Sequence, residues 1–388
     1  MSADRKVSSC LKEMIAEGFI PGGSVLVLRG GREVLYVNEG LADVENGVPV
    51  RRDSVFRLFS MTKPIIAAAA VLLAERGKID FSDYVEKYLP GFANQSVMED
   101  GCLVRPRRRV DLMDLLGMCG GLTYDGPDES GQQIVALMKE VQEKRETPAE
   151  LSTVEIANRI GGIPLAYQPG TRTRYSVSAD VMGAVIEMAA GEPLSAFLKR
   201  EFFDPLGMKD TGFCFREDQK ERIPTVYTKT AGKLVKLIPE KFGVTDFFRE
   251  PAFASGGGGL VSTIDDYARF CTMLLNMGEL DGRRILSPES VRFLMSPQHG
   301  EEKEFEILHE LSGTAYGKFM RHMVSPSKFP GFARMDEYGW DGWLGTYMAN
   351  FPHEDMTILI MTQVADGRIP AMHRRIRNVI LACESLGE

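Results

Sequence analysis

Ser60 and Lys63 are the two residues of this sequence whose types and spacing most directly suggest chemistry. They stand three positions apart, and an unbroken apolar run from Ile65 to Ala74 follows them. Residues three positions apart lie side by side on a helix, so the lysine amine can reach the serine hydroxyl. A serine becomes a nucleophile when a nearby base takes its proton, and burial among apolar residues favours the neutral amine that such a base requires. The spacing therefore predicts a nucleophile and its base at the start of a buried helix.

The alternative interpretation of this motif is a helix cap followed by a solvated lysine. A serine and a lysine at this spacing occur by chance in most proteins, so the pair is weak evidence alone. The apolar run from Ile65 to Ala74 is not typical of a surface helix, and this context favours the catalytic interpretation.

Tyr175 is a second candidate for proton transfer. It lies between Gln168-Pro169-Gly170 and a helix predicted for residues 179–190. A phenol at a helix entry and near an ammonium group is expected to have a lowered pKa, because both favour its anion. Such a group can accept the serine proton and later return it to a leaving group. The alternative is a helix-entry tyrosine that packs on the core.

The segment Trp340-Asp341-Gly342-Trp343 contains both tryptophans of the chain and lies on a strand predicted for residues 338–343. Gly342 has no side chain, so a ligand can approach the backbone closely there. A backbone N–H beside Gly342, together with the N–H of Ser60, is a candidate for binding the oxyanion of an acyl-transfer intermediate. The alternative is a hairpin whose aromatic side chains belong to the core.

The elements that must position these residues are predicted to form an α/β fold of the α+β type. Strand patterns near both ends of the chain, with helical patterns between them, predict one antiparallel sheet built from both termini, flanked by helices and carrying an inserted helical domain. We expect a sheet domain of residues 1–58 and 256–388, a helical domain of residues 59–255, and an active site in the cleft between them. Residues 213–255 show no clean period and are expected to be irregular. The predicted strands cover residues 24–29, 32–38, 338–343, 346–351 and 356–363.

Three local signals refine this picture. Gly30-Gly31 between the first two predicted strands indicates a two-residue hairpin. The glycine run 256–259 is not followed by Gly-Lys-Ser/Thr, so it indicates close backbone packing rather than a phosphate loop. Thr263 is a helix cap by its position before an apolar periodic segment.

Composition and charge exclude several classes of function. The chain has 388 residues, a net charge of -8 and a pI near 5.4, which argues against general binding of nucleic acids or anionic membranes. The first residues lack the apolar core of a secretory signal, and no stretch reaches the ~18 apolar residues that span a bilayer. Six cysteines are scattered without a Cys-x-x-Cys pair, which is typical of reduced thiols. We therefore expect a cytoplasmic protein.

Other catalytic arrangements find little support in the sequence. No Gly-x-Ser-x-Gly motif is present, and all five histidines follow residue 298 without a recognisable motif. We interpret His322 and His353 as packing or surface residues, which disfavours a Ser-His-Asp hydrolase. Without His-Glu-x-x-His or clustered thiols a zinc enzyme is also disfavoured, so we expect no cofactor and no metal.

The three motifs occur in the order and approximate spacing of the class C β-lactamase-like serine hydrolases, and the sequence resembles that group. The Ser-x-x-Lys signature also belongs to class A β-lactamases and penicillin-binding proteins. The resemblance extends over roughly residues 21–363 and includes the sequence between the motifs. The similar intervening segments are 115–122, Pro169-Gly170, 203–208 and 255–260.

Two departures separate the sequence from the β-lactamases of that class. Val177 stands where they carry the asparagine of Tyr-x-Asn, and Trp340-Asp341-Gly342 stands where they carry Lys-Thr-Gly. The lysine of that motif would attract a substrate carboxylate, which Trp340 cannot do. Trp-x-Gly at this strand is similar to the family VIII carboxylesterases and to a related fungal acyltransferase.

The resemblance implies roles for individual residues. Ser60 would attack an ester carbonyl, and Lys63 and Tyr175 would share the role of base, with the order of proton transfer left open. The N–H groups of Ser60 and Trp343 would bind the oxyanion, and water or another alcohol would then release the acyl group. The residues expected at the substrate pocket are Trp340, Gly342, Trp343, Tyr124 and Asp180, the last as support for the polar network.

We therefore expect a carboxylesterase whose partner is a small to medium acyl ester, with acyl transfer to alcohols as a second outcome and the oligomeric state left open. A β-lactamase or D-Ala-peptide hydrolase is the first alternative; the missing strand lysine and the expected cytoplasmic location count against it. A non-catalytic binding protein on the same scaffold is the second, and the presence of Ser60, Lys63 and Tyr175 together counts against that.

Overall fold

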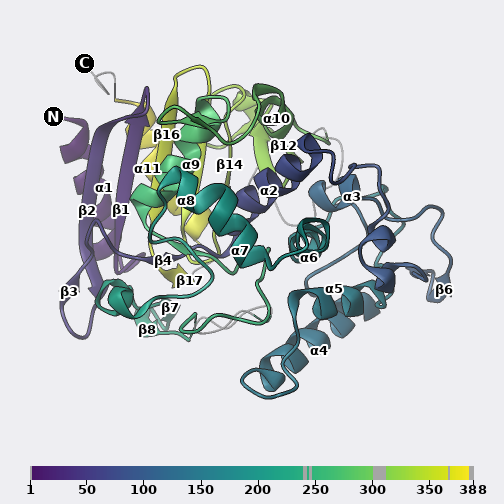
Figure 1. The fold of residues 1–388 in the computed structure, drawn as a ribbon. Coiled ribbons are helices and arrows are strands. Elements are labelled where there is room, and N and C mark those ends of the chain that lie inside the picture. The colour runs from purple at the N-terminus through teal and green to yellow at the C-terminus, as the bar shows by residue number, and fades with distance from the viewer. Residues whose placement is uncertain (1, 239–242, 244–246, 300–311, 366–367, 384–388) are drawn as a thin grey trace.

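A central antiparallel sheet organises the computed structural model, which describes residues 2–238, 243, 247–299, 312–365 and 368–383. Within these residues the sheet has eight strands in the order β12-β13-β14-β15-β16-β1-β2-β3 (Figure 1). Three of them come from the N-terminal part of the chain and the others from the C-terminal part, so the predicted sheet built from both ends is confirmed. Their bounds are β1 Gly22–Arg29, β2 Arg32–Asp43, β3 Val48–Pro49, β12 Thr314–Gly317, β13 Met320–Met323, β14 Tyr338–Asp341, β15 Tyr347–Phe351 and β16 Met356–Met361.

Strand β1 joins the two parts of the sheet. Its residues from Val25 to Leu28 are buried, as expected for a continuous apolar run that is covered on both faces. Gly30 and Gly31 have φ angles of +56° and +68°, the left-handed values that a two-residue hairpin requires, and they connect β1 to β2. On its other edge β1 pairs with β16, with Val27 opposite Ile358.

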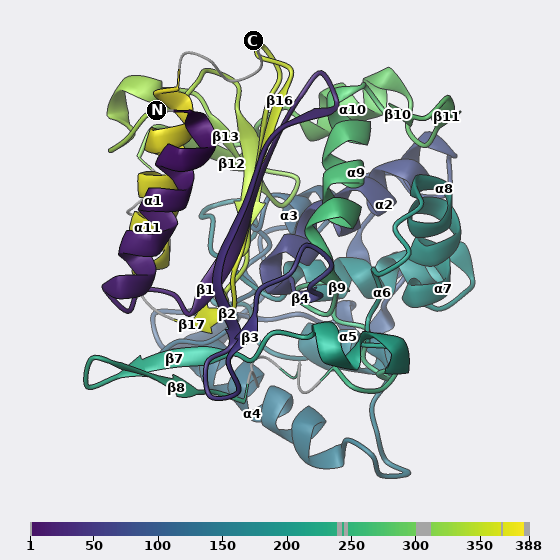
Figure 2. The same ribbon diagram turned by 90° about the vertical axis from the view of Figure 1, so that its left-hand side faces the viewer.

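Helices cover both faces of the sheet. α1 (Ala3–Ala16) and α11 (Ile369–Leu381) lie on one face, and α2 (Lys63–Glu75) and α9 (Ile264–Leu275) lie on the other (Figure 2). Each face has its own apolar core. Because side chains alternate along a strand, neighbouring residues of β14 belong to different faces: Trp340 packs in the core that contains α2.

Most of the other helices lie in residues 59–255. α6 is buried along most of its length and packs against α2 and α5. α3 and α5 begin with capping boxes, in which Asp111 and Ser152 accept the N–H of the third helical residue. The bounds of the remaining helices are α3 Leu112–Leu116, α4 Glu129–Lys144, α5 Thr153–Gly161, α6 Ser178–Ala190, α7 Leu194–Leu198, α8 Asp204–Leu206 and α10 Pro288–Leu294.

Short strand pairs connect the sheet region with the helical region. β4 pairs with β9, so the two passages of the chain near the predicted domain boundaries lie side by side. The boundaries themselves stay a prediction. Within the described residues no single helix is long and apolar enough to cross a membrane. The helices of residues 178–190 and 194–206, which are bent relative to each other, reach the length and apolar composition of a membrane span only when they are taken together. The short strands are β4 Phe56–Arg57, β5 Val97–Glu99, β6 Cys102–Val104, β7 Tyr227–Thr230, β8 Lys233–Lys236, β9 Val261–Ser262, β10 Glu279–Leu280, β11 Arg283–Arg284 and β17 Val364–Ala365.

The irregular structure predicted for residues 213–255 is wrong in part. β7 and β8 form a hairpin there, and β7 also pairs in parallel with β17 near the end of the chain. Ala231 and Gly232 connect the two strands with φ angles of +48° and +82°. They form a two-residue turn whose sequence is not the usual Asn-Gly or Asp-Gly. Residues 239–242 and 244–246 of this segment lie outside the described part of the chain.

Candidate active site

Ser60 lies on a tight turn immediately before α2. The 3₁₀ turn Phe59–Thr62 leads directly into the helix, whose first residue is Lys63. Phe59 has a φ of +45°, a left-handed conformation that costs a residue with a side chain about 1–2 kcal/mol. Phe59 and Met61 are buried, whereas Ser60 is partly exposed. The strained turn thus brings the hydroxyl out of the core while its neighbours stay within it.

Lys63 is completely buried and contacts Ser60, as the spacing predicts. Its Nζ lies 3.1 Å from Ser60 Oγ and donates a hydrogen bond of 2.6 Å to the carbonyl of Gly257. The same nitrogen lies 4.7 Å from the ring centre of Tyr175 and 5.4 Å from that of Tyr124. Burial lowers the pKa of Lys63 to about 7, because the ammonium loses its hydration. A substantial fraction of the amine is therefore uncharged near neutral pH.

Tyr175 contacts the same hydroxyl. Its phenol is hydrogen-bonded to Ser60, and Trp340 Nε1 donates to Tyr175 Oη at 3.2 Å. Burial raises the pKa of Tyr175 well above its usual value, so the expected lowering is wrong. The physical reason is that Tyr175 precedes α6 by three residues and is desolvated, while the neutral form of Lys63 offers no positive charge to stabilise a phenolate.

Asp180 and the glycine run hold the carbonyl that Lys63 contacts. The buried carboxylate of Asp180 accepts hydrogen bonds from Ser255 Oγ at 2.5 Å and from the N–H of Gly257 at 2.9 Å. A Cβ on Gly257 would lie 2.5 Å from Asp180 Oδ2 and 2.7 Å from Tyr124 Oη, so no side chain fits there. The close packing expected of the glycine run is confirmed. Burial raises the pKa of Asp180, and the nearby Lys63 opposes this shift.

The turn after β14 lies against the chain that leads into Ser60. A Cβ on Gly342 would lie 2.2 Å from the carbonyl oxygen of Leu58, and Thr346 Oγ1 donates to the same oxygen at 3.1 Å. The ring of Trp343 meets that of Phe59 edge-on, with centres 5.0 Å apart. Trp343 belongs to this turn and not to a strand, because β14 ends at Asp341; the predicted strand 338–343 is two residues too long.

An aromatic wall extends from Tyr175 along the sheet. The indole of Trp340 lies 5.6 Å from the ring of Tyr175 and 5.2 Å from that of Tyr316. The ring of Tyr124 is 5.4 Å from Tyr175. The structure thus brings Tyr124 and Trp340 of the predicted pocket next to Tyr175, and Trp343 next to Phe59. Their contact with a substrate stays a prediction.

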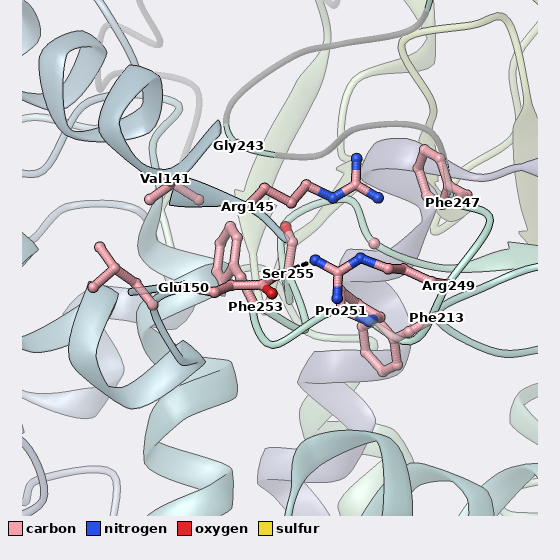
Figure 3. Close-up of a pocket in the computed structure, with 12 residues that line it drawn as sticks. Val141, Arg145, Glu150, Phe213, Gly243, Phe247, Arg249, Pro251, Phe253 and Ser255 are labelled. Atoms are coloured by element: carbon pink, nitrogen blue, oxygen red, sulfur yellow. Dashed lines mark hydrogen bonds and ion pairs between the residues drawn. The ribbon is translucent and has the colours of Figure 1, made fainter. Parts of the chain in front are cut away.

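A separate pocket borders the glycine run, and Figure 3 shows its lining. Arg249 forms an ion pair with Glu150 at 2.5 Å across it. It shares Ser255 and Gly259 with the run but none of the residues predicted for the substrate pocket. Its lining residues are Val141, Arg145, Glu150, Leu151, Phe213, Gly243, Phe247, Arg249, Pro251, Phe253, Ser255 and Gly259.

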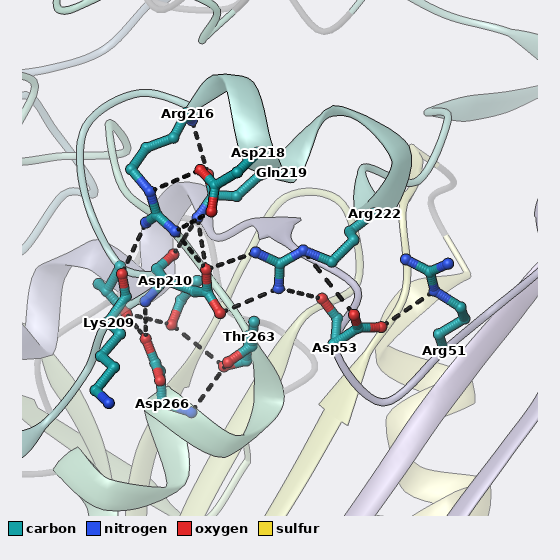
Figure 4. Close-up of polar contacts among 12 residues, drawn as sticks. Arg51, Asp53, Lys209, Asp210, Arg216, Asp218, Gln219, Arg222, Thr263 and Asp266 are labelled. Atoms are coloured by element: carbon teal, nitrogen blue, oxygen red, sulfur yellow. Dashed lines mark hydrogen bonds and ion pairs between the residues drawn. The ribbon is translucent and has the colours of Figure 1, made fainter.

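A second polar group, which we call the Asp210 cluster, shares no residue with the Ser60 site (Figure 4). It consists of Asp210, Arg216, Arg222 and Asp266. The carboxylate of Asp210 accepts hydrogen bonds from Arg222 at 2.7 Å and from Arg216 at 2.9 Å, and Asp266 accepts the N–H of Asp210 at 2.7 Å. Thr263 caps α9 through the N–H of Asp266, as predicted. The cluster fastens the segment after α8 to the start of α9.

Several contacts of the site were not foreseen from the sequence. The carbonyl of Gly257 is a partner of Lys63, Phe59 is left-handed, and His373 contacts the turn after β14. The glycine run was a visible signal for the first, whereas no local signal marked the other two. Within the described ranges, no group of three or more His, Cys, Asp or Glu side chains is placed to hold a metal ion.

The fold and the arrangement at Ser60 together define a serine hydrolase with a β-lactamase-like fold. The chain belongs to the beta-lactamase family, whose sequence model matches residues 7–381.

Individual relatives differ in their activities. The chain is 31% identical to esterase EstB of Burkholderia gladioli over 279 residues, which covers 68% of each chain. It is 25% identical to a putative D-alanyl-D-alanine carboxypeptidase of Escherichia coli, over 84% of this chain and 72% of the relative. The solved structure of EstCE1, described as a hydrolase with promiscuous acyltransferase activity, superposes with a TM-score of 0.83 at 26% identity and covers 97% of this chain and 98% of that one.

Proposed function

We propose that the protein is a carboxylesterase that forms an acyl-enzyme on Ser60. The observation that carries the proposal is a buried lysine with a pKa of about 7, placed 3.1 Å from the serine hydroxyl. An uncharged amine at this distance can take the hydroxyl proton as the oxygen attacks an ester carbonyl. The acyl group is then released to water or to another alcohol.

The hydrogen bonds around Lys63 favour it as the first base. A neutral amine has two N–H groups and one lone pair; the carbonyl of Gly257 takes one N–H, which leaves the lone pair able to face Ser60. Tyr175 has a raised pKa and stays a neutral phenol near pH 7. It therefore serves as a proton donor toward the departing alcohol, with its oxygen held by the indole N–H of Trp340. The phenolate then regains a proton from the Lys63 ammonium, so that both groups return to their starting forms.

The backbone N–H groups of Ser60 and Trp343 are the proposed oxyanion donors. The contacts of Gly342 and Thr346 with the carbonyl of Leu58 support this assignment, because they place the turn containing Trp343 beside the turn containing Ser60. Donors that are fixed before the reaction stabilise the developing charge without reorganisation.

An ester is favoured over a β-lactam or a D-Ala peptide by the residues at the end of β14. Trp340 points into the aromatic wall, and the carboxylate of Asp341 is paired with Arg321 at 2.5 Å, so neither offers a cation to a substrate carboxylate. The similarity to esterase EstB supports the same choice. The similarity to a putative D-alanyl-D-alanine carboxypeptidase keeps peptide hydrolysis as the second candidate.

The test compares Ser60→Ala with Ser9→Ala, an exposed serine of α1 that serves as control. The wild-type protein should hydrolyse short-chain p-nitrophenyl esters, and Ser60→Ala should lose at least about 10²-fold in kcat. A fluorophosphonate should label Ser60 in the wild type, as located by peptide mass mapping, and Ser9→Ala should behave as wild type.

Three results would contradict parts of this proposal. Unchanged turnover in Ser60→Ala would remove the nucleophile. Nitrocefin turnover equal to ester turnover would favour a β-lactamase, and D-Ala-peptide turnover equal to ester turnover would favour a D-Ala-peptide hydrolase. If the wild-type protein shows neither ester turnover nor labelling, the non-catalytic binding protein is the interpretation that remains.

We also propose that the protein works in the reducing environment of the cytoplasm. All six cysteines are free thiols, and Cys102 is exposed. An oxidising compartment would put such an exposed thiol at risk of oxidation. Fractionation of the host cell, followed by thiol labelling without reductant, should recover reduced protein in the cytoplasmic fraction.

A further inference from the structure

A buried charged group lies on the side of β14 that faces away from Tyr175. Trp340 points toward Tyr175, and the next residue, Asp341, points to the opposite face. The Asp341 carboxylate pairs with Arg321 of β13 at 2.5 Å. Arg321 is only 4% exposed and also donates to the carbonyl of Met348 on β15 at 3.1 Å. This arginine therefore ties the last residue of β14 to the strands on both of its sides.

His373 approaches the same place from α11. It is 3% exposed, and its Nε2 lies 3.0 Å from the carbonyl oxygen of Gly345. Burial lowers the pKa of His373, so the imidazole is neutral; because a carbonyl only accepts, the ring proton is on Nε2. The other ring nitrogen lies 4.0 Å from Asp341 Oδ2. The N–H of Gly345 closes the turn by donating to Gly342 at 3.0 Å.

These polar groups occupy positions where apolar residues would stabilise the fold as well. An ion pair with a buried partner gains little over a well-packed apolar replacement, because the buried charge, here that of Arg321, loses its hydration, while the side chain of Asp341 stays 32% exposed. What such a pair does provide is a fixed geometry. Here the contacts fix the turn that follows β14. Its start is held by the ion pair of Asp341 with Arg321, and its end is held by the hydrogen bond of His373 to Gly345.

We propose that Arg321, Asp341 and His373 are positioning residues that set the turn from Gly342 to Thr346 at its working distance from Ser60. The inference rests on the proposed function, in which this turn supplies an oxyanion donor. Such a donor must lie about 2.7–3.1 Å from the oxyanion, and a misplacement of about 1 Å can cost about 10²-fold in rate. The three residues touch no substrate and act through the backbone that they hold.

The central experiment compares His373→Leu with His373→Gln. Leucine fills the space without a donor, whereas the amide nitrogen of glutamine can replace Nε2 toward Gly345. For hydrolysis of p-nitrophenyl acetate, His373→Leu should lower kcat about 10- to 10²-fold and change KM by less than about 3-fold. The rate at which a fluorophosphonate reacts with Ser60 should fall by the same factor, because negative charge develops on its phosphoryl oxygen as Ser60 attacks phosphorus and fluoride leaves. His373→Gln should recover most of both losses.

Two variants separate positioning from stability. Glu337→Gln weakens the buried ion pair of Arg377 and Glu337, at 2.7 Å, which also joins α11 to the sheet region. It should lower the melting temperature while kcat stays within about 2-fold. Arg375→Gln, at a partly exposed position on α11 whose ion pair with Glu17 lies at the surface, should change neither quantity by much. If His373→Leu does not fold, Asp341→Asn is measured in its place, with the same expected fall in kcat at nearly constant KM.

The possible results are distinguishable. If the wild type neither turns over esters nor reacts with the phosphonate, the proposed function fails and this inference fails with it. If the wild type is active but His373→Leu keeps its kcat, or if leucine and glutamine lose activity equally, the positioning role is overturned while the esterase stands. A fall in kcat for Glu337→Gln as large as that for His373→Leu would also overturn it.

Discussion

The surroundings of Ser60 and the surroundings of Asp210 differ in whether they favour the neutral or the charged form of an ionisable group. At Ser60, burial outweighs the nearby partners: it lowers the pKa of Lys63 to about 7 and raises the pKa of Asp180 and Tyr175, so that each group is driven toward its neutral form. In the cluster, hydrogen bonds from Arg222, Gln219 and Arg216 hold the pKa of Asp210 well below its ordinary range.

This difference is the one we expect between a reactive site, as proposed for Ser60, and a structural one. The paired charges of Asp210, Arg216 and Arg222 stabilise the fold and keep their protons fixed across the physiological range, whereas burial raises the pKa of the neighbouring Asp266 to about 6. The groups at Ser60 are costly to bury, and Lys63 there has a pKa where a proton moves easily at neutral pH. Substitutions at the Ser60 site should therefore lower activity more than stability, and substitutions in the Asp210 cluster should lower stability more than activity.

The largest expected effect is on activity, from Lys63→Met. Methionine fills the same space without an amine, so the proposed general base is lost and kcat for short-chain esters should fall about 10²- to 10⁴-fold. The fold should be retained or gain stability, because the cost of burying an ammonium disappears. Steady-state kinetics and urea unfolding measure the two quantities. Loss of stability together with activity would contradict the comparison.

Asp210→Asn should show the reverse pattern. The substitution leaves two arginines without their shared carboxylate, and the free energy of unfolding should fall by about 1–3 kcal/mol, since the cluster is partly exposed. Ester turnover at a temperature where the protein is folded should stay near wild type. A kcat loss as large as that of Lys63→Met would show that the two regions are coupled.

The pH dependence of stability sharpens the comparison, with smaller effects. Unfolding restores Lys63 to its usual pKa of 10.5, so the unfolded chain binds more protons and this group makes stability rise from about pH 7 to pH 10.5. Asp210 contributes fully above its usual pKa of 3.8, and its contribution is lost as the pH falls through its folded pKa. Lys63→Met should remove the alkaline slope of stability against pH, and Asp210→Asn should remove the acidic slope, in urea unfolding curves recorded across pH.

Wild-type kcat/KM should rise through about pH 7, because the uncharged form of Lys63 becomes more abundant there.

The sequence predicted those parts of the structure that depend on local spacing or on strong apolar patterns. The contact of Lys63 with Ser60 follows from one helical turn, and the sheet follows from apolar strands near both ends of the chain. The hairpin of β7 and β8 was missed because its turn lacks the usual residues.

The remaining parts of the site depend on contacts between distant segments. The pKa of Tyr175 was predicted in the wrong direction because its burial results from Trp340 and Tyr124, which no local rule places beside it. His373 was passed over as one of several histidines without a motif, since its contact with Gly345 exists only once α11 has packed on the sheet.

The pairing of β1 with β16 has a consequence for biosynthesis. A ribosome makes Ser60 before it makes β16, the strand that pairs with β1, and before it makes Trp340, whose indole donates to Tyr175. Until then the edge of β1 lacks its partner. A nascent chain therefore carries Ser60 before its surroundings are complete, and we expect the proposed acyl chemistry to begin only after these strands have docked.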